Sequence, residues 1–374
     1  MLNFNSIYKF YYEWWKNIDK TLFVIIISLF SLGLFFSLVS TSLIASDKLD
    51  TNNYFFFFKH LIFISIGMII LIFFSSLNEK KLFKISIYLF LISLIFLFLV
   101  PVLGVEVKGS KRWLNLFFLP RFQPIELVKP FIIIFIASIL CIEKNFNIYF
   151  KYLLTFIAII PVCLLLMIQP DIGQALLVFL SWSILVFISG VSLPIILTII
   201  GFSLFSLFYM IFYISKFAYI KSRIQSFFNP IDGTHTFQPN KAIDAISSGG
   251  FFGKGIGEGT LKNKVPEAHT DYIISVISEE FGVIAIVLLL ILFLFFIYTL
   301  FKKIYLEKDE KIKLILTGTI CLIIFQTLIH IGVNIRLFPT TGMTLPFLSY
   351  GGSSIIGISI LSGIILNLTK TKVN

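Results

Sequence analysis

Three titratable side chains lie within five positions of one another: Glu267, His269 and Asp271. They stand just ahead of a long apolar run, at the mouth of a predicted membrane helix. Charged groups at that depth are costly, and those that are kept usually handle an ion, a substrate or a proton. A zinc site is not indicated, because no second histidine stands at ligand spacing and the others are scattered. Those others are His60, His235 and His330.

The apolar run over 281–301 has 21 residues, which is enough to cross a bilayer unaided. The helix is predicted to begin at Asp271 and to continue above the bilayer, or to line a wet cavity within it. On such a helix Asp271, Ser275 and Ser278 share one face, while Glu280 lies on the opposite side. The spacing therefore predicts a polar helical wall headed by Asp271.

A second polar segment, 105–130, carries five Lys and Arg residues. The forked donors of a guanidinium suit phosphate, so Lys111 and Arg112 are candidates to bind the pyrophosphate of a lipid-linked substrate. An interfacial anchor accounts for the same residues, with Trp113 at headgroup depth and the basic side chains on lipid phosphates. The residues alone leave both interpretations open.

Two helix starts are indicated by residue type. Pro124 suits the first turn of a helix, where its missing N–H costs nothing. Glu126 and Lys129 follow at i,i+3 spacing, so they share a face and could pair; both are further candidates for the phosphate side. Asp171 precedes the apolar run from Ile172 at an N-cap position, and capping is its simplest role.

The segment 215–271 is the least apolar part of the chain, and six of the eleven residues over 249–259 are glycine. Such a loop can turn tightly and approach a ligand closely. It is not a phosphate-binding Walker loop, because Gly255 stands where Ser or Thr should bind magnesium. A flexible lid and a backbone lining for a ligand both remain open. The candidate lining residues are Gly253, Lys254, Glu267 and His269.

Composition identifies the class of protein that positions these residues. The 374-residue chain is 58% hydrophobic and 13% charged, and it contains 45 phenylalanines. Soluble domains reach about 25% charged residues, so this is predicted to be an all-α polytopic membrane protein. No small-residue cleavage site follows the first apolar run, so we expect no cleaved signal peptide. Ten spans are predicted, near 21–45, 54–77, 83–103, 127–142, 152–168, 172–189, 192–214, 272–301, 312–335 and 345–368.

The ten spans form one predicted domain over 1–374, with 215–271 as a large extracytoplasmic loop between the seventh and eighth spans. An even number of spans places both termini on one side, where the loops hold 15 of the 30 Lys and Arg residues. Twelve of the other fifteen lie in 105–130 and 215–271, the two segments that look like an anion-binding surface. Outside them the excess of positive charge places both termini, including the segment 1–20, in the cytoplasm.

Five groups of residues match, in order, the motifs of a known family. They are Lys111-Arg112-Trp113 with Gln123–Glu126, then Gln169–Asp171, Ser248–Gly255, Pro266–Asp271 and Pro346–Ser354. The chain resembles the SEDS family (shape, elongation, division and sporulation), which includes FtsW, RodA and SpoVE. The resemblance covers essentially the whole chain, with mild departures at Ile125, Ile172 and Gln174. Thr341–Pro346 and Lys108–Gly109 resemble the division-type members more than the elongation-type members.

The resemblance implies a ten-helix peptidoglycan glycosyltransferase that polymerises lipid II on the outer face of the cytoplasmic (inner) membrane, at the division septum. It also implies a class B penicillin-binding protein as transpeptidase partner, together with other divisome proteins. The essential acidic residue of the family maps onto Asp271. Asp271 would then be the base that takes the proton from an acceptor hydroxyl. Lys111 and Arg112, with Lys129, would stabilise the departing pyrophosphate, alone or with a divalent cation.

Other functions are compatible with the same residues. An elongation-type polymerase would use the same chemistry. A lipid II flippase or an ion-coupled transporter would also need basic loops and carboxylates at membrane depth. A scaffold that only recruits the transpeptidase leaves Asp271 unexplained. The dense polar motifs lie on the exterior side, which favours a reaction on that side. We expect membrane lipid to surround the chain and no nucleic acid to bind it.

Overall fold

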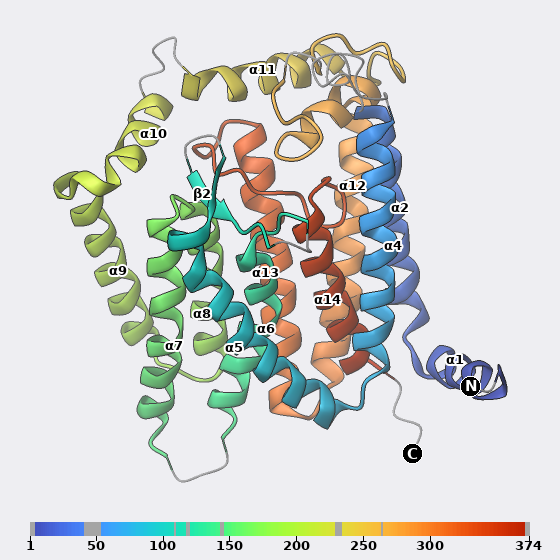
Figure 1. Ribbon diagram of the computed structural model, residues 1–374, viewed down its shortest axis with the longest axis vertical. Coiled ribbons are helices and arrows are strands. Elements are labelled where there is room, and N and C mark those ends of the chain that lie inside the picture. The colour runs from blue at the N-terminus through green and yellow to red at the C-terminus, as the bar shows by residue number, and fades with distance from the viewer. Residues whose placement is uncertain are drawn as a thin grey trace.

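The computed structural model describes residues 4–40, 54–107, 110–116, 120–142, 146–228, 234–262 and 265–370. Most of them are helical, and the long helices run side by side, with α10 and α11 at the end opposite α1 (Figure 1). The helices are α1 (Phe4–Asn17), α2 (Lys20–Ser40), α4 (Phe55–Ser76), α5 (Glu79–Leu103), α6 (Pro124–Leu140), α7 (Ile148–Ile168), α8 (Ile172–Ile188), α9 (Leu193–Tyr213), α10 (Ala218–Phe228), α11 (Thr234–Gly249), α12 (Ile273–Leu306), α13 (Glu310–Asn334) and α14 (Gly352–Leu368).

Each of the ten apolar ranges predicted from the sequence overlaps one helix of the structure. By length and composition, seven helices of the described ranges could cross a membrane: α2, α4, α5, α7, α9, α12 and α13. Helices α8 and α14 are apolar but have 17 residues each. The predicted helical membrane fold is therefore confirmed in outline. Residues 41–45 of the first predicted span, and Lys108–Gly109, lie outside the described residues.

The core of the molecule lies along α14, which is buried over nearly its whole length and packs against α4 and α6. Small residues let these helices approach closely. An added Cβ on Gly357 would lie 2.5 Å from the backbone oxygen of Glu126, and one on Gly363 would lie 2.8 Å from Cβ of Phe74. Helix α9 stands at the periphery, where Ile196 is its buried residue.

Both polar segments contain more regular structure than the sequence predicted. Residues of 105–130 form an antiparallel hairpin of β1 (Val105–Val107) and β2 (Ser110–Trp113), in which Glu106 pairs with Lys111. The segment 215–271, expected to be a loop, contains a short 3-10 turn (Ser215–Phe217), α10 and α11. Helix α11 crosses the top of the molecule above β2 (Figure 1). Neither segment has a long apolar run, so hydropathy alone did not reveal these elements.

Helix α12 is interrupted at Gly282, whose φ of 76° and ψ of −177° are not helical. Glycine adopts this conformation without a side-chain penalty. The interruption leaves backbone donors without helical partners, and the glycine-rich loop supplies acceptors. The N–H of Val283 donates to the carbonyl of Gly250 (3.0 Å), and that of Ile284 donates to the carbonyl of Phe251 (3.3 Å). The loop is thereby fixed against the start of the long apolar part of α12.

The predicted polar wall headed by Asp271 is wrong. Helix α12 begins at Ile273, and Asp271 lies in the turn before it. The N–H groups of Thr270, Asp271 and Tyr272 all donate to the carbonyl of Glu267, a pattern that closes a tight turn rather than a helix. Ser275 and Ser278 are buried instead of facing a cavity. Asp271 therefore reaches the cavity from a loop, which helical spacing could not predict.

Candidate active site

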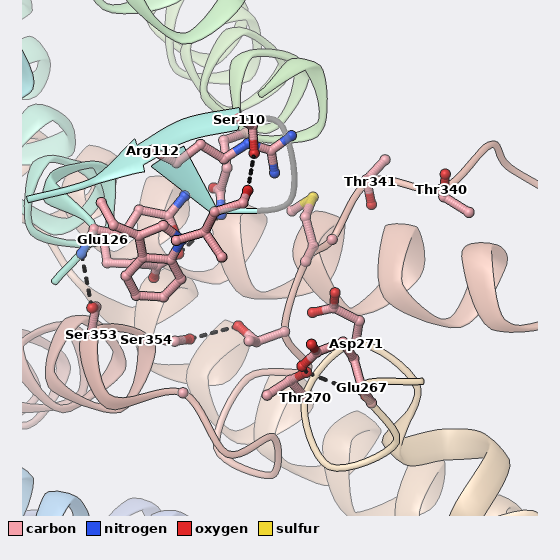
Figure 2. A pocket seen from close by; sticks show the side chains of 18 of the residues that line it. Ser110, Arg112, Glu126, Glu267, Thr270, Asp271, Thr340, Thr341, Ser353 and Ser354 are labelled. Atoms are coloured by element: carbon pink, nitrogen blue, oxygen red, sulfur yellow. Dashed lines mark hydrogen bonds between the residues drawn. The ribbon is translucent and has the colours of Figure 1, made fainter. Parts of the chain in front are cut away.

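A cavity of about 680 Å³ lies between the turn at 267–272, the β1–β2 hairpin, the first turns of α6 and α14, and the segment 340–344. This volume is typical of a small-molecule site. In Figure 2, Asp271 lies with Glu267 and Thr270 on one side of the cavity, and Arg112 and Glu126 lie on the other. The structure thus joins parts of three of the five motif groups singled out in the sequence.

The backbone of the Asp271 turn is held at three successive carbonyl oxygens. That of His269 accepts from the N–H of Tyr350 (2.9 Å), and that of Thr270 accepts from Oγ of Ser349 (2.6 Å). The carbonyl of Asp271 accepts from Nδ2 of Asn334 (3.0 Å), whose side chain is fully buried. Donors from α13 and from the 345–350 segment therefore fix the Asp271 backbone while its side chain lines the cavity.

The other two titratable residues of the turn have different environments. Glu267 lines the cavity, and one of its carboxylate oxygens accepts from Oγ1 of Thr270 (3.1 Å). The ring of His269 packs against Phe56 and Tyr350, with centroid separations of 4.5 and 5.7 Å. His269 is not among the residues that line the cavity. The sequence motif therefore separates in space into two cavity-lining carboxylates and one packing histidine.

Arg112 is oriented by the turn that joins α7 to α8. Its Nε donates to the carbonyl of Gln169 (3.3 Å), Nη2 donates to the carbonyl of Pro170, and Nη1 lies 3.6 Å from Oδ1 of Asp171. The guanidinium is largely buried and lines the cavity. Because several of its donors are bound by fixed acceptors, its position is set before any ligand enters.

Asp171 occupies the N-cap position of α8, but its side chain makes no capping hydrogen bond. Its carboxylate instead faces Arg112 and accepts from Nε2 of Gln123 (2.8 Å). Burial raises the pKa of the Asp171 carboxyl, and the Arg112 guanidinium opposes this rise. Asp171 thus stands at the N-cap position expected from the sequence, and its carboxylate also supports the position of Arg112.

Arg223 on α10 is another cavity-lining arginine, and it was not singled out as a site residue from the sequence. Its Nη1 donates to the carbonyl of Thr340 (3.3 Å). Burial and then the nearby Arg112 guanidinium lower the pKa of Arg223. Two arginines that repel one another across a cavity provide a place for an anion. The signal in the sequence was only the basic character of the segment 215–271.

Gly342 stands between the acidic and basic sides of the cavity, with a φ of 69°. A Cβ built on it would lie 3.5 Å from Nη1 of Arg112 and 3.5 Å from Oδ2 of Asp271. The two charged atoms are therefore no farther apart than twice that distance. A side chain on Gly342 would therefore contact both charged groups.

Glu126 and Lys129 form the predicted i,i+3 pair, with a separation of 2.8 Å. Both side chains are buried, at 4% and 3% exposure, so the charges are met by further polar groups. Nε2 of Gln174 donates to Glu126 (2.9 Å), and Lys129 donates to Oε1 of Gln326 (3.0 Å). Glu126 lines the cavity, whereas Lys129 lies beneath it. Lys129 is thus placed to hold Glu126 rather than to reach a ligand in the cavity.

Besides His269 and Lys129, three more of the predicted site residues are not brought to the cavity. Lys111 is exposed and adjoins Arg112 on β2, where neighbouring side chains point to opposite faces. Gly253 and Lys254 instead pack on α12: the N–H of Lys254 donates to the carbonyl of Glu279 (2.9 Å), and its Nζ lies 3.4 Å from Oε1 of the same residue. The glycine-rich loop is therefore bound to α12 and does not line the cavity.

Within the described ranges, no three His, Cys, Asp or Glu side chains converge in a way that could hold a metal ion. The positive groups at the cavity are arginines. The residues present therefore fit a site where protein cations meet an anionic ligand, and a divalent cation remains a prediction from the resemblance alone.

Comparison with known proteins identifies the family. The model of the FtsW, RodA and SpoVE family, described as "Cell cycle protein", matches residues 20–374. The chain belongs to this family. The resemblance drawn from the five ordered motifs is thereby confirmed, and the cavity described above is that of an FtsW/RodA/SpoVE protein.

Individual relatives agree with the family assignment. The chain is 31% identical over 363 residues to the probable peptidoglycan glycosyltransferase FtsW of Caulobacter vibrioides, covering 96% of this chain and 91% of that protein. It superposes with a TM-score of 0.76 and 27% identity on a chain from a structure of a peptidoglycan synthase complex that coordinates polymerization and crosslinking, covering 94% of this chain and 97% of that one. The rod shape determining protein RodA of Thermus thermophilus is 26% identical with a TM-score of 0.68, at 94% and 96% coverage.

Proposed function

We infer that this chain is a peptidoglycan glycosyltransferase, and we propose that it joins the sugars of lipid II into glycan strands. The observation that carries this proposal is the position of Asp271 and Arg112, a carboxylate and a guanidinium that line one cavity and both lie beside Gly342. Glycosyl transfer from a pyrophosphate-linked donor needs both groups: a base for the acceptor and a cation for the leaving group.

Asp271 is the proposed base. Its carboxylate accepts the proton of an acceptor sugar hydroxyl as the hydroxyl oxygen forms a bond to the anomeric carbon of the donor sugar. The bond from that carbon to the pyrophosphate oxygen breaks in the same step, and the leaving group carries away the electron pair. The hydrogen bonds to the backbone carbonyls of residues 269–271 hold the base in position before substrate binds.

Arg112 and Arg223 are the proposed cations for the pyrophosphate. Negative charge develops on the oxygen that leaves the donor, and fixed guanidinium groups stabilise it without reorganising. Arg112 is held by the carbonyls of Gln169 and Pro170, so it needs little rearrangement to bind phosphate. Lys111 and Lys129 are not given this role, since one points away from the cavity and the other is paired with Glu126.

We propose that ten helices cross the membrane: α2, α4 to α9, and α12 to α14. Helix α1 and the end of α14 lie at one end of the molecule, and α10 and α11 lie at the other (Figure 1). With both termini in the cytoplasm, the cavity beneath α11 faces the outer side. This arrangement supports the division of the single domain into a cytoplasmic segment over 1–20 and an extracytoplasmic segment over 215–271.

The biological role that we propose is septal wall synthesis with a class B penicillin-binding protein and other divisome proteins. Its support is the similarity to proteins named FtsW and to a component of a peptidoglycan synthase complex. The likeness to RodA keeps an elongation-type polymerase as the alternative. Both roles use the same site chemistry.

Polymerisation of purified lipid II in detergent tests the proposed reaction, because a micelle has no two sides between which a lipid could be flipped. The purified chain is incubated with lipid II and the partner transpeptidase, whose own crosslinking is blocked by a β-lactam. Glycan strands longer than the starting disaccharide are expected. Unchanged lipid II from a well-folded sample would instead support transport or scaffolding.

A further inference from the structure

The glycine-rich loop that follows α11 exposes large apolar side chains. Phe251, Phe252 and Ile256 are 74%, 82% and 65% exposed, and we refer to residues 251–256 as the Phe251–Ile256 tip. Adjacent exposed apolar residues of this size mark contact with another molecule or a membrane. The tip is not part of the cavity, so the proposed chemistry does not account for it.

Backbone hydrogen bonds fix the depth of the tip. The carbonyls of Gly250 and Phe251 accept from Val283 and Ile284, the first residues of α12 after its interruption at Gly282. From that point α12 is continuously apolar and long enough to cross a bilayer. The tip therefore lies level with the boundary of the membrane-spanning part of α12.

The exposed apolar surface continues from the tip onto that helix. Val283, Ile284, Val287 and Leu288 are exposed at 42%, 43%, 47% and 62%. These side chains belong to a segment that spans the bilayer, so lipid is the environment that their exposure fits. Gly250, just before the tip, and Phe251, its first residue, are bonded to the first two of them, which makes the tip an extension of a lipid-facing surface.

Two adjacent buried carboxylates hold the loop in this position. Glu279 accepts from the N–H groups of Leu261 (2.8 Å) and Lys262 (2.5 Å). Glu280 accepts from the N–H groups of Gly257 (2.5 Å) and Gly259 (3.3 Å), and it pairs with Nζ of Lys262 (2.5 Å). Because these two buried carboxylates bind four backbone N–H groups and the ammonium group of Lys262, they fix a single conformation of the loop. The tip is exposed in that conformation.

We propose that the Phe251–Ile256 tip inserts its apolar side chains into the bilayer leaflet beside the start of the spanning part of α12. Aromatic and aliphatic side chains presented by a loop at this level enter the boundary between headgroups and acyl chains. The insertion anchors the chain that leads to the Asp271 turn at the membrane surface. The proposal requires only that α12 spans the membrane, so its failure would leave the proposed chemistry untouched.

Spin labels in lipid nanodiscs test the insertion. The three native cysteines, Cys141, Cys163 and Cys321, are replaced by alanine, and single labels are placed through Phe252→Cys, Leu288→Cys and Asp244→Cys. Leu288 is the lipid-exposed reference on α12, and Asp244 on α11 is the water-exposed reference with 51% of its side chain accessible. Because Phe252 is 82% exposed, its replacement removes little packing.

The measurement compares collisions of each label with oxygen, which concentrates in lipid, and with a water-soluble nickel chelate. The label at position 252 should resemble that at 288, with oxygen collisions several-fold more frequent than nickel collisions, while the label at 244 shows the reverse. A nickel-accessible label at 252 would place the tip in water and overturn the proposal. A label at 252 reached by neither reagent would indicate contact with a protein surface and would also overturn it.

Discussion

Oδ2 of Asp271 and Nη1 of Arg112 each lie 3.5 Å from the point where a Cβ on Gly342 would stand, so the two atoms are no farther apart than twice that distance. Asp271 is held through its backbone carbonyl, which accepts from Asn334, and Arg112 is held through the turn at Gln169 and Pro170. The gap between them is where we expect the acceptor hydroxyl and the leaving oxygen of the donor to meet.

Filling that gap should reduce activity. Gly342→Ala places a methyl group against both the base and the guanidinium, and we expect kcat/KM for lipid II polymerisation to fall by about tenfold to a hundredfold. The positive φ also costs about 1–2 kcal/mol of stability for any residue with a Cβ. Gly190→Ala is the matched control, because its φ is 101° and nothing lies within 4 Å of the added Cβ. Equal activity of the two variants would contradict a functional gap.

Removing the donor to the Asp271 carbonyl should misplace the base. Asn334→Ala leaves that carbonyl without its buried side-chain partner, so we expect kcat to fall while KM changes little. The stability cost of a lost buried hydrogen bond is about 1–3 kcal/mol. Asn367→Ala is the control: its Nδ2 donates to the carbonyls of Phe74, Ser75 and Leu77, away from the cavity. The control should lower the melting temperature and leave kcat unchanged. A loss of kcat in Asn367→Ala as large as that in Asn334→Ala would show that Asn334 acts only through general packing.

The buried Glu126–Lys129 pair should behave as one unit in stability. Lys129→Met leaves the buried Glu126 carboxylate without its cation and should lower the unfolding free energy by about 3–5 kcal/mol. Glu126→Gln leaves the buried Lys129 ammonium without its anion, and we expect a loss of the same size. The double variant has no unpaired charge and should be more stable than the sum of the single effects implies. Thermal unfolding of the three variants in one detergent measures the coupling. Additive losses would show that the two charges do not depend on one another.

The ionisation of Asp171 should make stability depend on pH. Because burial holds the pKa of its carboxyl above the ordinary value of 3.8, the folded chain keeps this proton to a higher pH than the unfolded chain. Above 3.8 the unfolded chain has released the proton, so the contribution of Asp171 to stability falls as pH rises through its raised pKa. Asp171→Asn stays neutral, so its stability relative to the native chain should increase as the pH rises above 3.8. Parallel stability curves would contradict the raised pKa.

The sequence predicted the helices well because their cause is local. Each apolar run must satisfy its own backbone hydrogen bonds in lipid, so a long run is a helix whatever surrounds it. The Glu126–Lys129 pair was predicted for the same reason, since i,i+3 spacing alone brings the side chains together. The placement of Arg112 and Asp271 at one site came from the motif order of the family and not from spacing.

The missed features depend on distant contacts. Helical periodicity predicted a helix that begins at Asp271, but the carbonyl of Glu267 accepts from three N–H groups in a turn, and the helix begins only at Ile273. Glu279 and Glu280 bind backbone donors of a loop about twenty positions earlier in the chain, which no local pattern reveals. Arg223 reaches the cavity because α10 folds over it. Gly342 lies beside Asp271 and Arg112, which are far from it in the sequence, so no local pattern predicts its role.

The most direct test of the proposed reaction replaces the base without changing its size. Asp271→Asn is compared with Glu258→Gln, which makes the same carboxylate-to-amide change on an exposed residue outside the cavity. Both are purified with the partner transpeptidase, checked for equal melting temperature, and assayed for glycan polymer from lipid II. Asp271→Asn should lose polymerisation by about 10²–10⁴-fold, as expected for a missing general base, while Glu258→Gln retains it. Near-normal polymer from a folded Asp271→Asn variant would contradict the assignment of Asp271 as the base.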